Sequence, residues 1–367
     1  MESRLDHATR PEPAPLPPTP PTTQTGLPLN SFAGPIASYL EQLDARVLAQ
    51  ASEFDPEIVS YLDYVLGCHG KRLRPTLALL SGAATGGVTE RHLDLGVVVE
   101  MIHLATLVHD DIMDGATQRR KQPTAAHRWG AEISVLLGDC LFSRALQICS
   151  TRFTQDISRD ISAAVCEVCS GEILQTQRRF DLNLGLDAYL RIIRMKTAEL
   201  FRIPCELAGR LNGASDEICQ ALGRYGEALG MAYQVYDDCL DLLGAEETAG
   251  KTLGTDLERG KLTLPFLYLL ETISGEEHER LCEALLHAGS GSGNGNGLPK
   301  WSAAELVSIA TERGAIRRTL DTLQDNLTRA EEALALLPPS PARESLAAIP
   351  ASVARAVSEL PGLKSRV

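Results

Sequence analysis

The 367-residue sequence predicts an all-α protein. Apolar residues recur at spacings of three and four, for example at Leu95, Val98, Val99 and Ile102, and this periodicity is typical of helices that bury a face. No comparable stretch alternates β-branched and polar residues with the period of two that indicates strands. A hydrophobic fraction of 44% is enough for a large buried core and excludes wholesale disorder.

Two low-complexity segments accompany the helical part. Residues 1–30 hold eight of the 20 prolines, which predicts a disordered leader. Residues 288–298 are rich in glycine and predict a flexible loop between late helices. No shift in composition divides residues 31–367, so we expect one helical domain there.

Charge and cysteine content exclude several classes of protein. Thirty-five Lys and Arg against 48 Asp and Glu give a net charge of −13, which disfavours nucleic-acid binding. The longest apolar runs, such as residues 262–270, are shorter than the roughly 20 residues of a membrane-spanning helix, so we expect no span. Nine scattered cysteines and the lack of an apolar secretory signal indicate reduced thiols and a cytoplasmic location. Cys166 and Cys169 are expected to be ordinary buried thiols on a helix.

One acidic pattern, Asp-Asp-x-x-Asp, occurs twice, at residues 110–114 and 237–241. On a helix, its first and last carboxylates lie one turn apart on the same side. Either pattern alone is compatible with an acidic helix end. Each follows an apolar helix that should line a core, however, and clustered acids there are costly unless a cation shares them. Carboxylates without His or Cys suit Mg2+ that is completed by phosphate oxygens. The candidate metal ligands are Asp110, Asp111, Asp114, Asp237, Asp238 and Asp241.

Basic residues gather near these acids in an otherwise acidic chain. Residues 71–74 carry three positive charges, residues 119–121 follow the first acidic pattern, and Lys196 and Lys261 lie near the second. Any one of them is compatible with a surface salt bridge. Together they predict a diphosphate site, because Arg and Lys make charge-assisted contacts to phosphate oxygens.

The ordered motifs resemble the trans-type isoprenyl diphosphate synthases over about residues 35–275. The matching positions are GKRLRP at 70–75, His103, DDIMD at 110–114 with Arg119 and Arg120, Gly171 and Glu172 with Gln175, Lys196 and Thr197, Gln234 with DDCLD at 237–241, and GKLTLP at 260–265. The resemblance implies a single-domain bundle of mostly antiparallel helices around a deep apolar cavity, usually a homodimer. It also implies head-to-tail (1'-4) condensation of isopentenyl diphosphate with an allylic diphosphate, using three Mg2+ ions per active site.

The resemblance also implies roles for individual residues. The six aspartates would hold Mg2+. Arg119, Lys196 and Lys261 would bind the allylic diphosphate, and Lys71, Arg74, His103 and Arg120 would bind isopentenyl diphosphate. Thr197 and Gln234 would border the reacting carbons. We expect the released diphosphate to accept the final proton, since no uncommitted base occurs among the motifs.

Product length should depend on the residues that precede the first acidic pattern, namely Ile102, Ala105 and Thr106. The absence of bulky aromatic residues there resembles synthases of geranylgeranyl or longer products. Two alternatives remain. A class I terpene cyclase would share the bundle, but usually resembles an Asn/Ser/Glu pattern at the second metal site. The chain could also be the catalytic subunit of a heteromeric synthase.

Overall fold

The computed structural model describes residues 32–68, 70–244, 255–287 and 303–364. The predicted leader (1–30) and glycine-rich loop (288–298) lie outside these residues. The helices are α1 (Ala37–Ala49), α2 (Val59–Leu66), α3 (Leu73–Thr85), α4 (Glu90–Met113), α5 (Ala125–Trp129), α6 (Ala131–Arg152), α7 (Gln155–Gln177), α8 (Leu186–Ile193), α9 (Glu199–Leu211), α10 (Asp216–Leu243), α12 (Thr255–Glu258), α13 (Leu264–Thr272), α14 (Glu276–His287), α15 (Ala303–Glu312), α16 (Ala315–Ala333), α17 (Pro341–Ser358) and α18 (Pro361–Lys364).

Shorter elements connect these helices. Three are single 3₁₀ turns: η2 (Gly34–Ile36), η3 (Gln50–Glu53) and η5 (Leu334–Leu336). A π-helical segment, η4 (Arg194–Ala198), joins α8 to α9. Two strands, β1 (Gln118–Arg119) and β2 (Gln122–Pro123), pair as an antiparallel hairpin after α4. The predicted all-α class is therefore confirmed, with one small hairpin that the sequence pattern did not predict.

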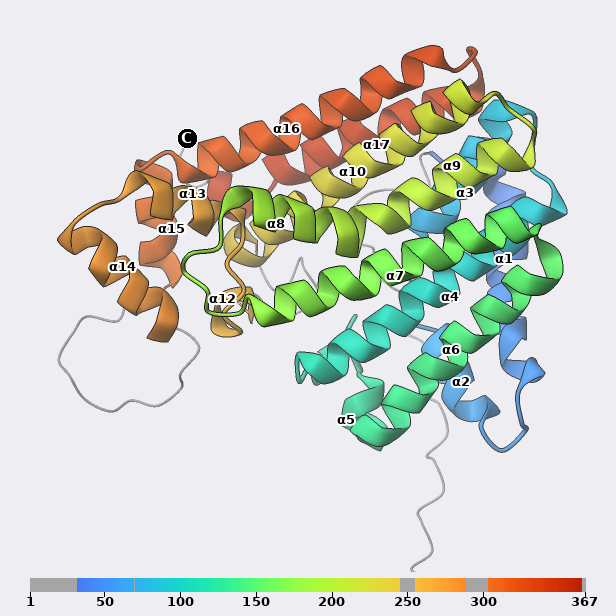
Figure 1. The fold of residues 1–367 in the computed structure, drawn as a ribbon, viewed down its shortest axis with the longest axis horizontal. Helices are drawn as coiled ribbons and strands as arrows, with labels where there is room; N and C mark the ends of the chain where they lie inside the picture. Colours follow the sequence, from blue (N-terminus) through green and yellow to red (C-terminus); the bar gives the residue numbers. More distant parts are fainter. Residues whose placement is uncertain (1–31, 69, 245–254, 288–302, 365–367) are drawn as a thin grey trace, which may run out of the picture.

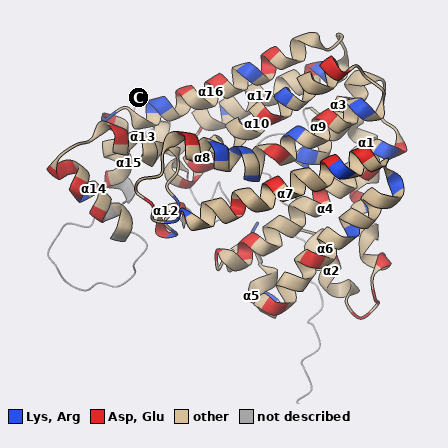
Figure 2. Ribbon diagram, in the orientation of Figure 1, with Lys and Arg blue, Asp and Glu red and all other residues tan. Residues whose placement is uncertain are grey.

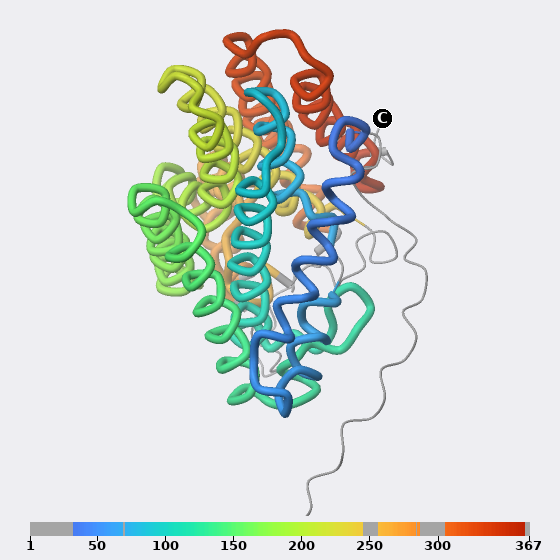
Figure 3. Tube along the Cα trace, turned by 90° about the vertical axis from the view of Figure 1, so that its right-hand side faces the viewer, coloured from blue at the N-terminus to red at the C-terminus, as the bar shows by residue number. Residues whose placement is uncertain are grey.

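The long helices lie side by side as a bundle (Figures 1 and 3). Helix α10 packs against α9 and α16, while α4 packs against α3 and α6. Consecutive partners such as α9 and α10 run in opposite directions, because a link of only four residues joins them. The buried side chains form one continuous hydrophobic cluster that runs through these helices. Lys and Arg are interspersed with Asp and Glu over the outer helices (Figure 2).

Polar side chains fix where the two longest helices begin. At the start of α4, the backbone N–H of Thr89 donates to Nδ1 of His92 at 3.1 Å. At the start of α10, Ser215 accepts a hydrogen bond from the backbone N–H of Ile218. Such caps satisfy amide groups that have no partner within the helix. Both helices then run without interruption to the acidic patterns at their ends.

One helix, α6, is long and apolar enough to cross a membrane by length and composition, and 39% of its most apolar window is buried in the bundle. Its apolar character is not visible as an uninterrupted apolar run in the sequence, because Ser134, Asp139 and Ser143 interrupt it. All nine cysteines are free thiols, as predicted. The prediction for Cys166 and Cys169 is half wrong: both lie on helix α7, but both are exposed.

Candidate active site

The two acidic patterns occupy the carboxyl-terminal turns of α4 and α10. Carbonyl groups at a helix end carry partial negative charge, so each end adds to the charge of its carboxylates. Both regions should therefore attract cations strongly. The structure supplies those cations to the first pattern and mostly neutral donors to the second.

In the first pattern, two aspartates are held by basic side chains. Asp111 is buried and pairs with Arg119, whose Nε lies 2.9 Å from Oδ1 and 3.1 Å from Oδ2. Asp114 accepts hydrogen bonds at 3.0 Å from both Lys261 and Arg179. Burial alone would raise the pKa of Asp114, but Lys261 and neighbouring arginines lower it below its ordinary value. Asp114 is thus held in the charged form, whereas burial raises the pKa of Asp111 despite its bond to Arg119.

Asp110 is in a different position. Within the described residues its carboxylate makes no hydrogen bond or ion pair, and burial together with the nearby Glu172 raises its pKa to about 6. Glu172 instead pairs with Lys196 at 3.4 Å, and Lys196 donates to Gln175 at 2.6 Å. Burial opposes the charged form of Lys196, but Glu172 and Asp110 raise its pKa, so the ammonium stays charged. Asp110 is therefore available to a cation from outside the chain.

In the second pattern, uncharged groups bind the central carboxylate. Asp238 is 2% exposed; it accepts hydrogen bonds from the Tyr189 hydroxyl and from Gln234 Nε2, the latter at 2.9 Å. Burial and the nearby Asp256 raise its pKa to about 7. Asp241 accepts a hydrogen bond from the backbone N–H of Asp256 at 3.2 Å.

The positive charge of Arg119 lies near carboxylates of both acidic patterns. Burial lowers the pKa of Arg119, but the hydrogen bond and charge of Asp111, followed by the charges of Asp110 and Asp237, raise it above its ordinary value. One guanidinium therefore lies near carboxylates of both helices. Asp237 is also near Lys71, which approaches from the segment before α3. The structure thus brings together both acidic patterns and the basic residues that the sequence singled out.

Arg119 and Arg120 owe their positions to the β1–β2 hairpin. Arg120 and Lys121 form its two-residue turn, with φ angles of 53° and 63°. Positive φ at both central residues is the signature of a type I′ turn, which suits a tight hairpin. Arg119 extends to Asp111, while Nη1 of Arg120 donates to the carbonyl of Cys68 at 2.8 Å. Each strand has only two residues, too few for the alternation that reveals strands in a sequence.

The segment 70–75 is held by a buried ion-pair network that sequence reasoning missed. Arg72 adopts a left-handed backbone conformation (φ 47°), and its guanidinium binds Glu100 at 2.6 Å and Asp44 at 2.8 Å. Left-handed backbone is unfavourable for a residue with a Cβ, so these contacts must hold it in place. The network ties α1 and α4 to the residues that carry Lys71, just before α3, and Arg74, in the first turn of α3. The sequence signal that could have predicted this network is Glu100, an acidic residue within an apolar stretch of α4.

Arg74, in the first turn of α3, forms a pair with His103 of α4. Nη1 of Arg74 lies 3.0 Å from Nε2 of His103, and its guanidinium lies 4.8 Å from the centre of the Phe201 ring. Burial and then the charge of Arg74 lower the pKa of His103 well below its ordinary value, so the imidazole is neutral. Nε of Arg74 is buried without a hydrogen-bond partner among the described residues. Such an orphaned donor suits an anionic ligand.

Lys196 and Thr197 lie on the π-helical segment η4. The extra residue in this turn changes the direction of the side chains, and such segments often occur at functional sites. Gly171 of α7 allows η4 to approach, because a Cβ at this position would lie 2.7 Å from the backbone nitrogen of Lys196. The Thr197 hydroxyl donates to Oε1 of Gln234 at 2.7 Å.

The three predicted chain-length residues lie upstream on α4. Ile102 and Ala105 are buried, with exposed fractions of 1% and 0%, whereas Thr106 is half-buried. Nε2 of His109 lies 3.1 Å from the carbonyl of Val135 on α6. Ala105 precedes His109 by about one turn, so it lies on the face of α4 that is directed towards α6.

The carboxylates of this region are suitable ligands for Mg2+, although the described residues contain no preformed cluster of ligands. Within the described residues, no group of three or more His, Cys, Asp or Glu side chains is arranged to hold a metal. Mg2+ in phosphate-transfer sites usually takes one or two carboxylates and completes its shell with waters and substrate phosphates. Asp110 and Asp237, which both lie near Arg119, could each supply one carboxylate in that mode. A site in which all six carboxylates surround one ion does not match that mode.

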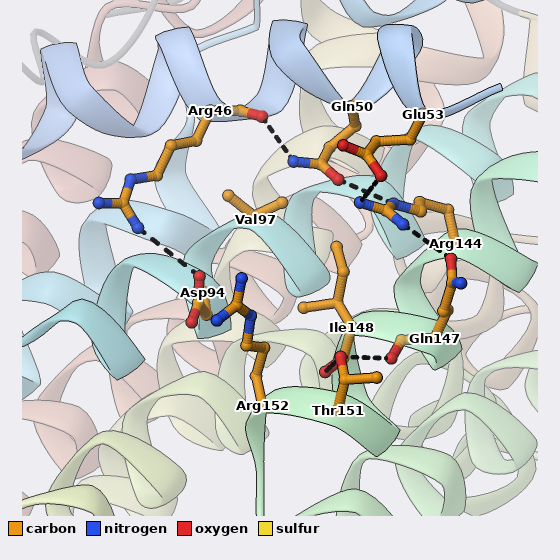
Figure 4. Close-up of a pocket in the computed structure, with 10 residues that line it drawn as sticks. All are labelled: Arg46, Gln50, Glu53, Asp94, Val97, Arg144, Gln147, Ile148, Thr151 and Arg152. Carbon is orange, nitrogen blue, oxygen red and sulfur yellow. Dashed lines mark hydrogen bonds and ion pairs between the residues drawn. The ribbon is translucent and has the colours of Figure 1, made fainter.

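A polar pocket of about 490 Å³ lies elsewhere, between α1, η3, α4 and α6 (Figure 4). Its lining residues are Arg46, Gln50, Glu53, Asp94, Val97, Arg144, Gln147, Ile148, Thr151 and Arg152. Arg144 is bound there to Glu53 at 3.0 Å and to Gln50 at 2.9 Å. Val97 precedes Asp110 by 13 residues, roughly 20 Å along α4. This pocket is therefore separate from the acidic patterns.

Comparison with known proteins agrees with this geometry. The chain is 32% identical over 319 residues to a short chain isoprenyl diphosphate synthase of Methanothermobacter thermautotrophicus, covering 86% of this chain and 95% of that protein. It is 32% identical over 313 residues to an all-trans-nonaprenyl-diphosphate synthase of Rhodobacter capsulatus, covering 85% and 93%. A crystal structure of a polyprenyl synthase from Caulobacter crescentus, complexed with calcium and isoprenyl diphosphate, superposes with a TM-score of 0.80 at 31% identity, covering 92% and 100%. The polyprenyl synthetase family model matches residues 55–293. The chain belongs to the polyprenyl synthetase family and is a prenyltransferase.

Proposed function

We propose that this prenyltransferase condenses isopentenyl diphosphate head to tail (1'-4) with an allylic diphosphate and forms an all-trans polyprenyl diphosphate. The observation that carries the proposal is the position of Arg119, whose charge is shared by Asp110 and Asp111 of one pattern and Asp237 of the other. A diphosphate bound beside Arg119 would be in reach of metal ions on both patterns.

The family is generally metal-dependent, and we propose Mg2+ as the metal, with three ions per active site. Asp110, Asp114 and Asp237 are the ligands we favour. Asp110 makes no hydrogen bond or ion pair within the described residues, and Asp114 and Asp237 are the other end positions of the patterns nearest to it and to Arg119. Bound Mg2+ would stabilise the diphosphate as it leaves the allylic carbon.

The basic residues around Asp114 would support the same step. Lys261 lies 3.0 Å from Asp114, and Lys196 is charged beside Asp110. Their ammonium groups, together with Arg119, would bind the oxygens of the leaving diphosphate. Preorganised cations of this kind lower the barrier because they need not reorganise as charge develops. Thr197 and Gln234 would border the allylic carbons.

Isopentenyl diphosphate would bind to Lys71, Arg74, His103 and Arg120. The neutral imidazole of His103 can accept a hydrogen bond from Arg74 and so fix its guanidinium. The unpartnered Nε of Arg74 would then have a phosphate oxygen as its acceptor. The released diphosphate would take the final proton.

The direct test is to incubate the purified chain with Mg2+, labelled isopentenyl diphosphate and a set of allylic primers. We expect products longer than the primer by whole isoprene units, and chelation should abolish them. A terpene cyclase would instead release a cyclic hydrocarbon without isopentenyl diphosphate. Activity of the chain alone would contradict a need for a second subunit. Failure to incorporate label with every primer would overturn the proposal.

We propose products of geranylgeranyl length or longer, because Ile102, Ala105 and Thr106 include no bulky aromatic side chain that would stop a growing tail. A105F should then shorten the main product, as judged by chromatography. A351F, on the exposed side of α17, is the matched control and should leave the product ladder unchanged. Circular dichroism should establish that A105F is folded, and Thr106→Phe offers a second variant at a half-buried position. An unchanged ladder in both folded variants would exclude a tail beside these residues.

We also propose a homodimer, a cytoplasmic location, and a single domain over residues 31–367. Support for the dimer comes from the outer face of α6 and α7, where Val135, Leu136, Leu146 and Ile173 are 42–60% exposed. Large apolar side chains grouped on adjacent helices often mark an interface. Replacing Val135 and Leu136 with Glu should yield monomers in sedimentation experiments, whereas the exposed Leu336→Glu control should not. A wild-type monomer would contradict the proposal.

A further inference from the structure

We propose that Tyr189 and Asp238 are positioning residues that orient Gln234 and Thr197, and that Asp238 is not a magnesium ligand. This inference rests on the proposed function, since it assigns roles within the same site. It changes the prediction made from the acidic pattern alone, in which all six aspartates hold metal.

Three hydrogen bonds connect these residues in a single chain. The Tyr189 hydroxyl donates to Oδ2 of Asp238, and Nε2 of Gln234 donates to Oδ1 at 2.9 Å. The Thr197 hydroxyl then donates to Oε1 of Gln234 at 2.7 Å. The chain runs from α8 through α10 to η4, and so joins three elements around the site.

These hydrogen bonds give each of the four side chains a defined role as donor or acceptor. Gln234 turns its NH₂ group towards Asp238 and its carbonyl oxygen towards Thr197, the orientation that an ionised Asp238 requires. Thr197 must then use its proton on Gln234. Its hydroxyl oxygen keeps its lone pairs for other partners. Two electron-rich oxygens are thus held in fixed positions where the allylic carbon would become positive.

Burial makes this arrangement rigid and explains the tyrosine. Tyr189, Thr197 and Asp238 are 3%, 7% and 2% exposed, so none of them can exchange its partner for bulk water. A buried phenol needs an acceptor, and a buried carboxylate needs donors. Each therefore satisfies the other. Because both oxygens of Asp238 already accept hydrogen bonds from Tyr189 and Gln234, a metal would have to compete with these donors.

The test compares Y189F with Y225F. Tyr225 is also buried and makes one hydrogen bond, to the carbonyl of Leu346 at 2.8 Å, but it lies outside the site. Y189F should lower kcat about 10- to 100-fold, while the KM of each substrate changes less than about threefold. Y225F should lose thermal stability without that loss of kcat. Equal kcat values for Y189F and wild type would overturn the proposal.

A double-mutant cycle separates positioning from a general structural effect. If Tyr189 acts through Gln234, adding Y189F to Q234A should lower kcat by less than about threefold more. Independent, multiplicative losses would show that Tyr189 does not act through Gln234 and would overturn that part of the inference.

The metal assignment is tested without turnover. Thermal shifts of the full chain with Mg2+ and inorganic diphosphate should give D238N a half-saturating Mg2+ concentration within about threefold of wild type. D237N should raise it at least about tenfold. An equal rise in D238N would make Asp238 a ligand and overturn the proposal. This readout stands even if the wild-type chain transfers no prenyl group, so the two failures are distinguishable.

Discussion

The two acidic patterns share a sequence but not an environment. At the end of α4, Asp111 and Asp114 are bound by arginines and a lysine. At the end of α10, Asp238 is bound by a phenol and an amide. Several partners come from segments far away in the chain, such as Lys261 for Asp114 and α8 for Asp238. The same arrangement of three aspartates therefore acquires different properties from its surroundings.

The difference appears in the pKa of the best-held carboxylate of each pattern, although burial raises the pKa of Asp111 as well as that of Asp238, its counterpart. Cations lower the pKa of Asp114 despite its burial, whereas burial and Asp256 raise the pKa of Asp238 to about 7. A charge-compensated pattern can bind metal at once. In the second pattern, Asp238 is bound by neighbouring side chains, and Asp237 is the leading candidate for a metal ligand. The comparison teaches that a repeated motif need not mean a repeated set of roles.

The largest expected effect concerns the first aspartate of each pattern, where we expect the two regions to agree. D110A and D237A should each lower kcat by about 10³-fold or more, because each removes a metal ligand. D187A, at an exposed position on α8, is the control and should retain nearly full activity. Steady-state kinetics and far-ultraviolet circular dichroism provide the measurements. Near-normal turnover in either folded variant would refute the metal role of that residue.

The next effect concerns the guanidinium that both patterns share. R119K keeps the charge but loses the fork that reaches both oxygens of Asp111, so kcat/KM for the allylic diphosphate should fall about 10- to 100-fold. R178K is the control, since Arg178 is exposed and pairs with Asp181. Its kcat/KM should stay within about twofold of wild type. If R119K behaves like R178K, the link between the two patterns has no catalytic importance.

Much of this site could be predicted from local sequence. The acidic patterns end helices as expected, and Arg119, Lys196 and Lys261 lie beside them. These features depend on spacing within one helix and on charge balance, which a sequence displays directly. The all-α fold follows from periodicity for the same reason.

The remaining features depend on contacts between distant segments. Nothing near Tyr189 or Arg72 in the sequence indicates that these side chains bind Asp238 and Glu100. The π-helical turn at Lys196 depends on how closely Gly171 lets α7 approach. The exposure of Cys166 was mispredicted because an apolar thiol indicates burial only when a neighbour covers that face of the helix.

The smallest effect tests the pKa contrast between Asp238 and Asp114 in metal-free protein. A folded-state pKa of about 7 exceeds the ordinary value of 3.8, so the folded chain binds this proton more tightly than the unfolded chain. The stabilisation from Asp238 is therefore present at low pH and is lost as pH rises from about 4 to about 7. Asn cannot titrate, so D238N should remove a slope of at most about 1.4 kcal/mol per pH unit.

Asp114 provides the opposite case. Its pKa is lowered, so its stabilisation is lost only as pH falls below the ordinary value of 3.8. D114N should therefore remove no titration of its own between pH 5 and 7; any change of slope there would come from Asp110, whose pKa of about 6 the charge of Asp114 helps to raise. Urea unfolding with a chelator at pH 5, 6 and 7 measures all three proteins. Parallel curves for wild type and D238N would mean that Asp238 is ionised throughout this range. The two patterns would then differ in their partners but not in their charge.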